Sequence, residues 1–278
     1  MKLAGVMGWP VCHSLSPQLH GWWLQHYGIQ GAYIPLAVQP MHFSEVTRVL
    51  GKAGFRGANV TMPHKEAALS VMDEATPLAQ RIGAVNTIVY THNDQLIGSN
   101  TDSFGFIENL HNRIPDWHVS NADGPAVILG AGGVARAIVA ALVDQGVKKL
   151  FVVNRSHHRA MILAAHIGGP IEVVDWSERE KVLEGATLLV NATILGMLGV
   201  QPLIIDLRAL PKRAVVVDAV YVPYFTPLLA QASARGNPVV DGLGMLLHQA
   251  RPGFAAWFGV DPEVTEELRS FMLKLYSV

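Results

Sequence analysis

The chain has a single cysteine, Cys12, and its charges almost cancel. One cysteine excludes an internal disulfide and is typical of a protein from a reducing compartment. The 21 Lys and Arg residues stand against 22 Asp and Glu residues, which leaves a formal net charge of −1. This balance offers no electrostatic footprint for nucleic acid or for an anionic membrane, so we expect neither as a partner.

Long apolar runs are also missing from the chain. No run of about 18 apolar residues occurs, so we expect no segment that spans a membrane. The apolar part of residues 1–8 is too short for a signal peptide, so we expect none. The sequence contains no internal repeat and no low-complexity tract. These features together predict a cytoplasmic protein.

The chain does have the length and apolar content for two folded domains. Its 278 residues are 50% hydrophobic, which is enough for two cores of ordinary size. Short apolar runs alternate with helical patterns, and this alternation predicts an α/β fold. We place a first domain at 1–101, a second at 102–240, and C-terminal helices at 241–278 that return to the first. The helices are expected at 245–249 and 262–275, with Asp261 capping the latter.

The second domain is expected to be a doubly wound parallel sheet of the Rossmann type. The apolar run 127–129 is followed by glycines and then by an Ala-rich segment, which predicts a buried strand, a tight turn and a helix. Gly130 permits the turn, Gly132 lets a pyrophosphate approach the backbone, and Ala135 lets the helix lie close to the strand. The pyrophosphate would lie at the helix N-terminus. The predicted cofactor-binding turn consists of Gly130, Ala131, Gly132, Gly133 and Ala135.

The next predicted strand, 150–153, indicates which dinucleotide binds. It ends at Asn154, Arg155 and Ser156, and Arg159 follows one helical turn later. An acidic residue here would accept a hydrogen bond from the 2′-hydroxyl of NAD. An arginine instead suits a 2′-phosphate, because guanidinium is always charged and can bind phosphate with two hydrogen bonds. We therefore predict NADP, and the alternative is that Arg155 is only an exposed loop arginine.

Hydroxyls, amides and one ammonium gather at the ends of elements outside the nucleotide pattern. They belong to Ser14, Ser16, Asn59, Thr61, Lys65, Asn86, Thr87, Asn100, Thr101 and Asp102. Such groups suit a small polyhydroxylated carboxylate. Each also has a purely structural alternative: Ser16 and Asp102 would serve as helix caps, and Lys65 would be a solvated lysine.

In their order along the chain, these motifs resemble those of the shikimate dehydrogenase family over essentially the whole length. The matching segments are 8–10, 13–17 with His20, 59–65, 83–87, 98–102, 130–135, 154–156, 191–193 with 196–197, 218–229 and 241–250. Two positions depart from the family pattern. Gly21 stands where the family usually has Asn, and Ile194 stands where Pro is common. Neither position carries the expected chemistry, so the departures concern local loop geometry.

The resemblance implies a substrate domain and an NADP domain separated by a cleft, with no metal. It implies that Ser14 and Ser16, with help from Tyr221, hold a substrate carboxylate, and that Lys65 is catalytic together with Asp102. The remaining substrate-binding residues implied are Asn59, Thr61, Asn86 and Gln249. Beyond the glycine turn and residues 154–159, the cofactor-binding residues implied are Thr193, Met197 and Gly242.

The resemblance implies NADPH-dependent, reversible reduction of 3-dehydroshikimate to shikimate, a step of chorismate and aromatic amino-acid biosynthesis. The small-molecule substrate and NADP are the expected partners, and the chain is expected to be a monomer or a homodimer. Two alternatives remain open. One is a quinate/shikimate dehydrogenase of the same family that uses NAD, and the other is a non-catalytic nucleotide-binding regulator on this fold.

Overall fold

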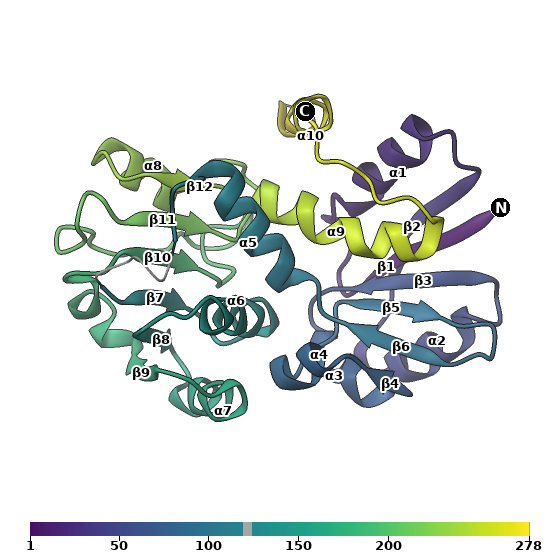
Figure 1. Ribbon diagram of the computed structural model, residues 1–278, viewed down its shortest axis with the longest axis horizontal. Coiled ribbons are helices and arrows are strands. Elements are labelled where there is room, and N and C mark those ends of the chain that lie inside the picture. The colour runs from purple at the N-terminus through teal and green to yellow at the C-terminus, as the bar shows by residue number, and fades with distance from the viewer. Residues whose placement is uncertain (119–123, 278) are drawn as a thin grey trace. The chain divides into compact units, whose positions relative to one another are not determined.

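The computed structural model describes residues 1–118 and 124–277. Contacts between residues divide the chain into two compact units (Figure 1). The first unit comprises Met1–Asp102 and Leu247–Val278, and the second comprises Ser103–Leu246. The first change of unit lies one residue after the predicted boundary at 101/102. The second lies six residues after the predicted boundary at 240/241, because the first turn of a long C-terminal helix groups with the second unit.

A six-stranded mixed sheet forms the centre of the first unit. Its strands, in spatial order, are β2 (Gly31–Ala37), β1 (Lys2–Gly8), β3 (Phe55–Val60), β5 (Thr87–Tyr90), β6 (Leu96–Ser99) and β4 (Glu74–Ala75). β1 runs parallel to β2 and β3, whereas β5 is antiparallel to both β3 and β6. The predicted hairpin across residues 91–95 is therefore confirmed, and it places the ends of β3 and β6 on either side of β5.

Helices cover both faces of this sheet (Figure 1). On one face lie α2 (Phe43–Leu50), α3 (Lys65–Val71) and α4 (Pro77–Ile82), and their apolar side chains join those of β3 and β5 in one core. On the other face lie α1 (Ser16–His26), α9 (Gly242–Phe258) and α10 (Glu266–Lys274). The central strands β1, β3 and β5 are thus mostly buried, and the polar side chains near their ends are buried polar groups beside the apolar core.

The C-terminal helices differ from the expected ones in their bounds. α9 spans 17 residues and includes Pro252, whereas the predicted helix covers only 245–249. α10 begins at Glu266 and is capped by Thr265, whose hydroxyl accepts a hydrogen bond from Leu268 N at 3.2 Å. The predicted cap at Asp261 is wrong, because this carboxylate pairs with Arg251 at 3.2 Å instead.

Two tryptophans attach these helices to the rest of the first unit. Trp257 Nε1 on α9 donates to Ile88 O at 2.9 Å, and Trp23 Nε1 on α1 donates to Glu263 O at 3.1 Å. Both indole rings are buried, so each hydrogen bond satisfies a donor that has left water. The return of the C-terminal segment therefore rests on packing and on specific polar contacts.

The second unit contains a six-stranded sheet in which every pairing is parallel. Its strands, in spatial order, are β12 (Val239–Val240), β11 (Val215–Asp218), β10 (Leu188–Asn191), β7 (Ala126–Leu129), β8 (Leu150–Asn154) and β9 (Ile171–Asp175). Counted in chain order this is 3-2-1-4-5-6 reversed, the arrangement of a doubly wound dinucleotide-binding sheet. The predicted fold class is confirmed. Ligands of such sheets bind where the strand order reverses, here at the carboxyl ends of β7 and β10.

The helices of the second unit are α5 (Asp102–Arg113), α6 (Gly133–Asp144), α7 (His157–Ile167) and α8 (Pro227–Ala234). One face of the sheet packs against α8 and the segment 203–210, which contribute buried leucines and isoleucine to a single core. No helix in the described parts of the chain is long and apolar enough to cross a membrane.

Candidate active site

Ser14 and Ser16 lie in the connection from β1 to α1. The cap predicted at Ser16 is wrong, because α1 begins at Ser16 itself. Ser14 supplies the polar contact instead: its Oγ accepts a hydrogen bond from Ser16 N at 3.3 Å. The Ser16 side chain is therefore not used to start the helix, and it is 6% exposed at the end of the sheet.

Asn59 and Thr61 lie at the carboxyl end of β3. Asn59 is buried within the strand, while Thr61 follows the strand and is half-buried. Thr61 N donates to Met7 O at 2.9 Å, and this bond joins the ends of β1 and β3. The close approach is visible at Gly8, where an added Cβ would lie 2.5 Å from Thr61 Cγ2. The adjacent ends of these two strands thus carry two of the predicted substrate-binding residues.

Lys65 and Asp102 form an ion pair inside the first unit. Lys65 Nζ lies 2.5 Å from Asp102 Oδ2, and the two side chains are 15% and 5% exposed. Lys65 begins α3 shortly after β3, and Asp102 begins α5 shortly after β6. The alternative roles as a solvated lysine and a helix cap are both excluded. At the start of α5 the side chain of Asn100, rather than that of Asp102, satisfies a backbone N–H, because Asn100 Oδ1 accepts from Asp102 N at 3.0 Å.

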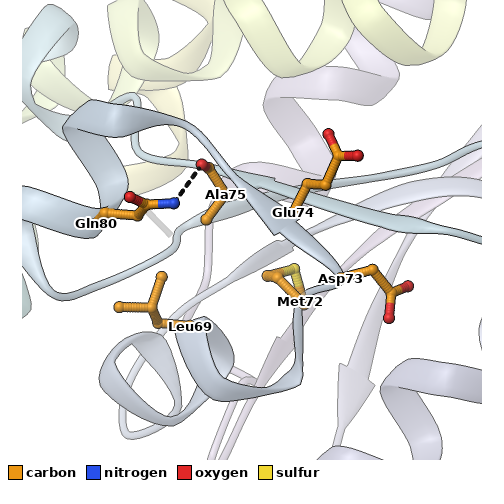
Figure 2. A pocket seen from close by; sticks show the side chains of 6 residues that line it. All are labelled: Leu69, Met72, Asp73, Glu74, Ala75 and Gln80. Carbon is orange, nitrogen blue, oxygen red and sulfur yellow. Dashed lines mark hydrogen bonds between the residues drawn. The ribbon is translucent and has the colours of Figure 1, made fainter.

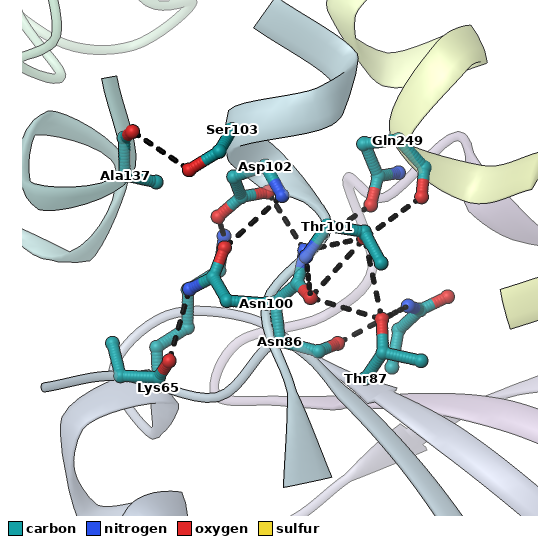
Figure 3. Close-up of polar contacts among 11 residues, drawn as sticks. Lys65, Asn86, Thr87, Asn100, Thr101, Asp102, Ser103, Ala137 and Gln249 are labelled. Atoms are coloured by element: carbon teal, nitrogen blue, oxygen red, sulfur yellow. Dashed lines mark hydrogen bonds and ion pairs between the residues drawn. The ribbon is translucent and has the colours of Figure 1, made fainter. Parts of the chain in front are cut away.

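The side-chain amide of Asn86 connects this ion pair to the neighbouring polar groups (Figure 3). Asn86 Nδ2 donates to Asp102 Oδ1 at 2.8 Å and to Thr101 Oγ1 at 3.0 Å. Asn86 Oδ1 accepts from Thr101 N and from Thr87 Oγ1, each at 2.9 Å. Asn86 is 1% exposed, so these bonds replace the water that its amide has lost. Asp102 is consequently held by two donors, one on each carboxylate oxygen.

Gln249 joins the same group from α9. The hydroxyl of Thr101 donates to Gln249 O at 2.8 Å, and Asn86 Nδ2 lies 3.4 Å from Gln249 Oε1. Figure 3 shows Gln249 above Thr101, with Asn86 and Thr87 below it. The structure therefore brings together Lys65, Asp102, Asn86 and Gln249. Thr87 and Thr101 complete the network. The sequence analysis placed both among the polar strand-end groups but assigned neither a role in binding.

An open hollow elsewhere in the first unit contains none of the predicted site residues. It is lined by Leu69, Met72, Asp73, Glu74, Ala75 and Gln80 (Figure 2). Its two carboxylates would repel an anionic substrate, and a hydrogen bond from Leu96 N lowers the pKa of Asp73, so that side chain stays charged. Gln80 already donates to Ala75 O at 3.0 Å. The hollow is therefore a poor site for a carboxylate ligand.

In the second unit, the glycine turn has the backbone that a dinucleotide requires. Gly130 has φ +116°, and a Cβ there would lie 3.0 Å from Ala192 O, so both the conformation and the space demand glycine. A Cβ at Gly132 would meet nothing within 4 Å. Gly132 precedes α6, whose first turn has no side-chain cap. The turn thus presents free N–H groups beside open space, as a pyrophosphate needs. Ala131 and Ala135 are buried, and Gly133 starts the helix.

The residues after β8 differ in how their side chains are used. Asn154 Nδ2 donates to Ser156 O at 2.9 Å, and Ser156 Oγ caps α7 by accepting from Arg159 N at 3.4 Å. Arg155 is exposed and makes no hydrogen bond or ion pair with any part of the chain that the structure describes. The neighbouring Asp175 carboxylate pairs with His157 instead, at 3.0 Å. Arg155 is therefore available to an external anion.

A buried carboxylate supports the loop beside the glycine turn. Asp218, at the end of β11, is 0% exposed and accepts from Asn191 Nδ2 at 2.9 Å, Val220 N at 3.0 Å and Thr226 Oγ1 at 2.7 Å. Burial raises the pKa of Asp218 to about 6, although the three hydrogen bonds oppose this shift. Asn191 Oδ1 in turn accepts from Thr193 N and Thr193 Oγ1. Thr193 is thereby oriented by the loop, and sequence reasoning missed the supporting role of Asp218.

Three predicted residues remain, and all lie in the second unit. Met197 is half-buried in the loop after β10. Gly242 begins α9. A Cβ at this position would lie 2.6 Å from Val220 O, so close packing alone explains why the residue is glycine. Tyr221 follows β11 and is half-buried, and burial raises its pKa. The predicted contact between Tyr221 and the carboxylate held by Ser14 and Ser16 stays a prediction.

The fold and the two groups of residues define a two-unit α/β protein with one dinucleotide-type sheet and one separate polar site built around a Lys–Asp pair. Among the described residues no cluster of three His, Cys, Asp or Glu side chains could hold a metal ion. Comparison with known proteins gives the family. Residues 6–88 match the family described as the shikimate dehydrogenase substrate binding domain, and residues 116–200 match the family described as shikimate/quinate 5-dehydrogenase.

Individual relatives agree over nearly the whole chain. The shikimate dehydrogenase (NADP(+)) of Paramagnetospirillum magneticum is 59% identical over 272 residues, 98% of each chain. The shikimate 5-dehydrogenase of Thermus thermophilus, solved with NADP(H) and shikimate, is 36% identical with a TM-score of 0.84, covering 100% of this chain and 99% of that one. A quinate dehydrogenase of Corynebacterium glutamicum, solved with NAD, is 31% identical with a TM-score of 0.86, covering 100% and 99%. The chain belongs to the shikimate dehydrogenase family.

The buried Asp218 predicts a specific pH dependence of stability. Its pKa in the folded protein is about 6, above the unfolded value of 3.8, so the folded state binds its proton more tightly. The corresponding stabilisation is complete below pH 3.8 and is lost as the pH rises through 6, and its size is of the order of 3 kcal/mol. In Asp218→Asn this titration is absent. We therefore expect the free energy of unfolding of the wild type, minus that of the variant, to fall between pH 4 and pH 7 in urea titrations. A difference that stays constant across this range would contradict the assignment.

Proposed function

We propose that this protein catalyses the NADPH-dependent, reversible reduction of 3-dehydroshikimate to shikimate, a step of chorismate and aromatic amino-acid biosynthesis. The observation that carries the proposal is the buried Lys65–Asp102 pair, held by Asn86 in a unit of the family's substrate-binding type. An ammonium beside a carboxylate, among hydroxyls and amides, suits a polyhydroxylated ring with a reducible carbonyl.

Substrate binding is assigned to the polar groups at the strand ends of the first unit. Ser14 and Ser16 bind the carboxylate, since the Ser16 hydroxyl is not consumed as a helix cap. Thr61, Asn86 and Gln249 bind ring hydroxyls, and Asn59 supports Asn86 from behind, donating to Asn86 O at 3.1 Å. Tyr221 is the further carboxylate ligand that the family resemblance implies. These contacts fix which ring atom meets the hydride and which oxygen meets Lys65.

Lys65 carries the proton chemistry of the proposed mechanism. NADPH, when bound, supplies the hydride that reduces the ring carbonyl. The carbonyl oxygen then becomes negative, and Lys65 Nζ stabilises that charge and donates its proton to the oxygen. Asp102 keeps the ammonium oriented through its 2.5 Å contact and accepts from the adjacent ring hydroxyl. In the reverse direction Lys65 Nζ takes the proton from the hydroxyl that is oxidised.

The turn Gly130–Gly133 with Ala135 binds the pyrophosphate, and Asn154, Arg155, Ser156 and Arg159 bind the 2′-phosphate end. Thr193, Met197 and Gly242 complete the cofactor site. Two observations support this assignment: a Cβ at Gly132 would meet nothing within 4 Å, and the exposed Arg155 has no hydrogen bond or ion pair with the described residues. The NAD-using quinate dehydrogenase is the nearest competing function, since a protein of that kind shares the fold. An arginine after β8 favours NADP over it.

The location and assembly of the enzyme follow as part of the proposal. Cys12 is exposed and unpaired with any other cysteine, which suits the reducing cytoplasm. The proposed activity needs only residues of one chain, so we propose that it works as a monomer or as a homodimer of independent sites.

Replacement of Arg155 tests the choice of cofactor. We expect Arg155→Ala to weaken NADPH binding by about 10- to 150-fold, the equivalent of one charged hydrogen bond, and to leave NADH binding nearly unchanged. Isothermal titration calorimetry with both cofactors measures this. Arg208→Ala is the matched control, because Arg208 is an exposed arginine of the same unit that pairs with Asp206. Equal losses for NADPH and NADH would show that Arg155 does not bind the 2′-phosphate.

Replacement of Lys65 tests the mechanism. We expect Lys65→Ala to reduce kcat by about 10²- to 10⁴-fold, the usual contribution of a positioned acid–base group. The dissociation constant for NADPH should not change, and substrate affinity should change little. Steady-state kinetics and calorimetry provide the two readouts, and Lys52→Ala, at an exposed lysine of the same unit, is the control. A Lys65→Ala enzyme with nearly normal kcat would exclude the proposed mechanism.

A further inference from the structure

Tyr33 is a buried tyrosine of β2 that lies behind the proposed substrate site. Its hydroxyl donates to Asn59 Oδ1 at 2.6 Å, and both side chains are 6% exposed. The ring stacks on His20 with 3.9 Å between centroids and 1° between planes, and it lies 6.0 Å from the ring of Trp257. Burial lowers the pKa of His20 to about 3, so the stacked imidazole is neutral. The Tyr33 ring is thus packed against a neutral imidazole and an indole, and its hydroxyl is directed at Asn59.

From this hydroxyl a chain of hydrogen bonds leads to Asp102. Tyr33 donates to Asn59 Oδ1, and Asn59 Nδ2 donates to Thr87 Oγ1 at 3.1 Å. The Thr87 hydroxyl donates to Asn86 Oδ1 at 2.9 Å, and Asn86 Nδ2 donates to Asp102 Oδ1 at 2.8 Å. Asp102 Oδ2 receives Lys65 from the other side. Every step has one donor and one acceptor, so the chain has a single direction that ends at the carboxylate.

The side-chain amide of Asn59 uses both of its N–H donors and its carbonyl oxygen within this chain. Asn59 Nδ2 uses its two hydrogens on Asn86 O and Thr87 Oγ1, and Asn59 Oδ1 accepts from Tyr33. A side-chain amide has two N–H donors and a carbonyl oxygen with two lone pairs, and here both donors and one lone pair are engaged. If the Tyr33 hydroxyl is removed, the buried oxygen Asn59 Oδ1 loses the hydrogen bond that Tyr33 donates to it. The amide would then turn away or admit water, and either change would loosen its hold on Asn86 and Thr87.

We propose that Tyr33 is a positioning residue, which fixes the Asn86 amide, and through it the Asp102–Lys65 pair, in the orientation that the reaction uses. The inference rests on the proposed function, because it acts through the group assigned to proton transfer. Tyr33 donates to Asn59, and its effect on the ion pair passes along the chain of Asn59, Thr87 and Asn86.

The test compares two Tyr→Phe variants of the full-length enzyme. Tyr33→Phe removes the first donor of the chain, and we expect kcat to fall about 3- to 10-fold, the effect of one net hydrogen bond, with an unchanged dissociation constant for NADPH. Tyr90→Phe is the matched control. Tyr90 lies in β5 of the same sheet and is buried, but its hydroxyl has no hydrogen-bond partner among the described residues. Its removal should leave kcat unchanged. Equal kcat values for Tyr33→Phe, Tyr90→Phe and wild type would overturn the proposal.

A double-mutant cycle separates positioning from a general loss of packing. In a Lys65→Ala background the chain ends at a carboxylate with no ammonium to orient, so Tyr33→Phe should lower kcat no further. If Tyr33→Phe lowers kcat by the same factor in both backgrounds, the role of Tyr33 is merely structural and the proposal is overturned.

If Tyr33→Phe does not fold, Thr87→Val interrupts the same chain at the next side chain after Asn59. This variant must then reproduce both the loss of kcat and the non-additivity with Lys65→Ala. If the wild type itself does not oxidise NADPH with 3-dehydroshikimate, the proposed function fails, whereas an active wild type with an inert Tyr33 rejects only this inference.

Discussion

The proposed chemistry of this protein depends on one buried amide, the side chain of Asn86. Asn86 lies directly before β5, which is flanked by β3 with Asn59 and by β6, and Asp102 follows β6 at the start of α5. The side-chain amide of Asn86 donates to Asp102 and accepts from Thr101 N and Thr87 Oγ1. A polar group in an apolar interior is costly unless it is hydrogen-bonded, so a fully bonded amide has only one low-energy orientation. That orientation places an N–H against Asp102 and leaves the other carboxylate oxygen to Lys65.

In the second unit a buried carboxylate, rather than a buried amide, orients the neighbouring polar groups. Asp218 is buried and gathers Asn191 and Thr226 around it, and Asn191 then orients Thr193 next to the glycine turn. In both units a buried polar side chain thus holds a segment that we propose to contact a ligand, and such support is what precise positioning of a ligand requires.

Sequence reasoning captured what depends on local pattern. The glycine turn at Gly130, the parallel sheet and the polar strand ends all follow from the spacing of apolar, glycine and polar residues. It could not tell that Ser14, and not Ser16, supplies the side-chain oxygen at the start of α1, because either serine offers the same oxygen within one turn of the helix. It also missed Tyr33, which lies far along the chain from Asn59 and meets it only when β2 and β3 flank β1. Long-range partners of this kind leave no periodic signal.

The proposed enzyme pairs one substrate with one cofactor, and the rate of NADPH oxidation tests this pairing. Purified enzyme is supplied with 3-dehydroshikimate or 3-dehydroquinate, each with NADPH or NADH, and the loss of reduced cofactor absorbance is followed. We expect kcat/KM to be highest by far for 3-dehydroshikimate with NADPH. Faster reaction of 3-dehydroquinate with NADH, or no oxidation with 3-dehydroshikimate under any condition, would contradict it.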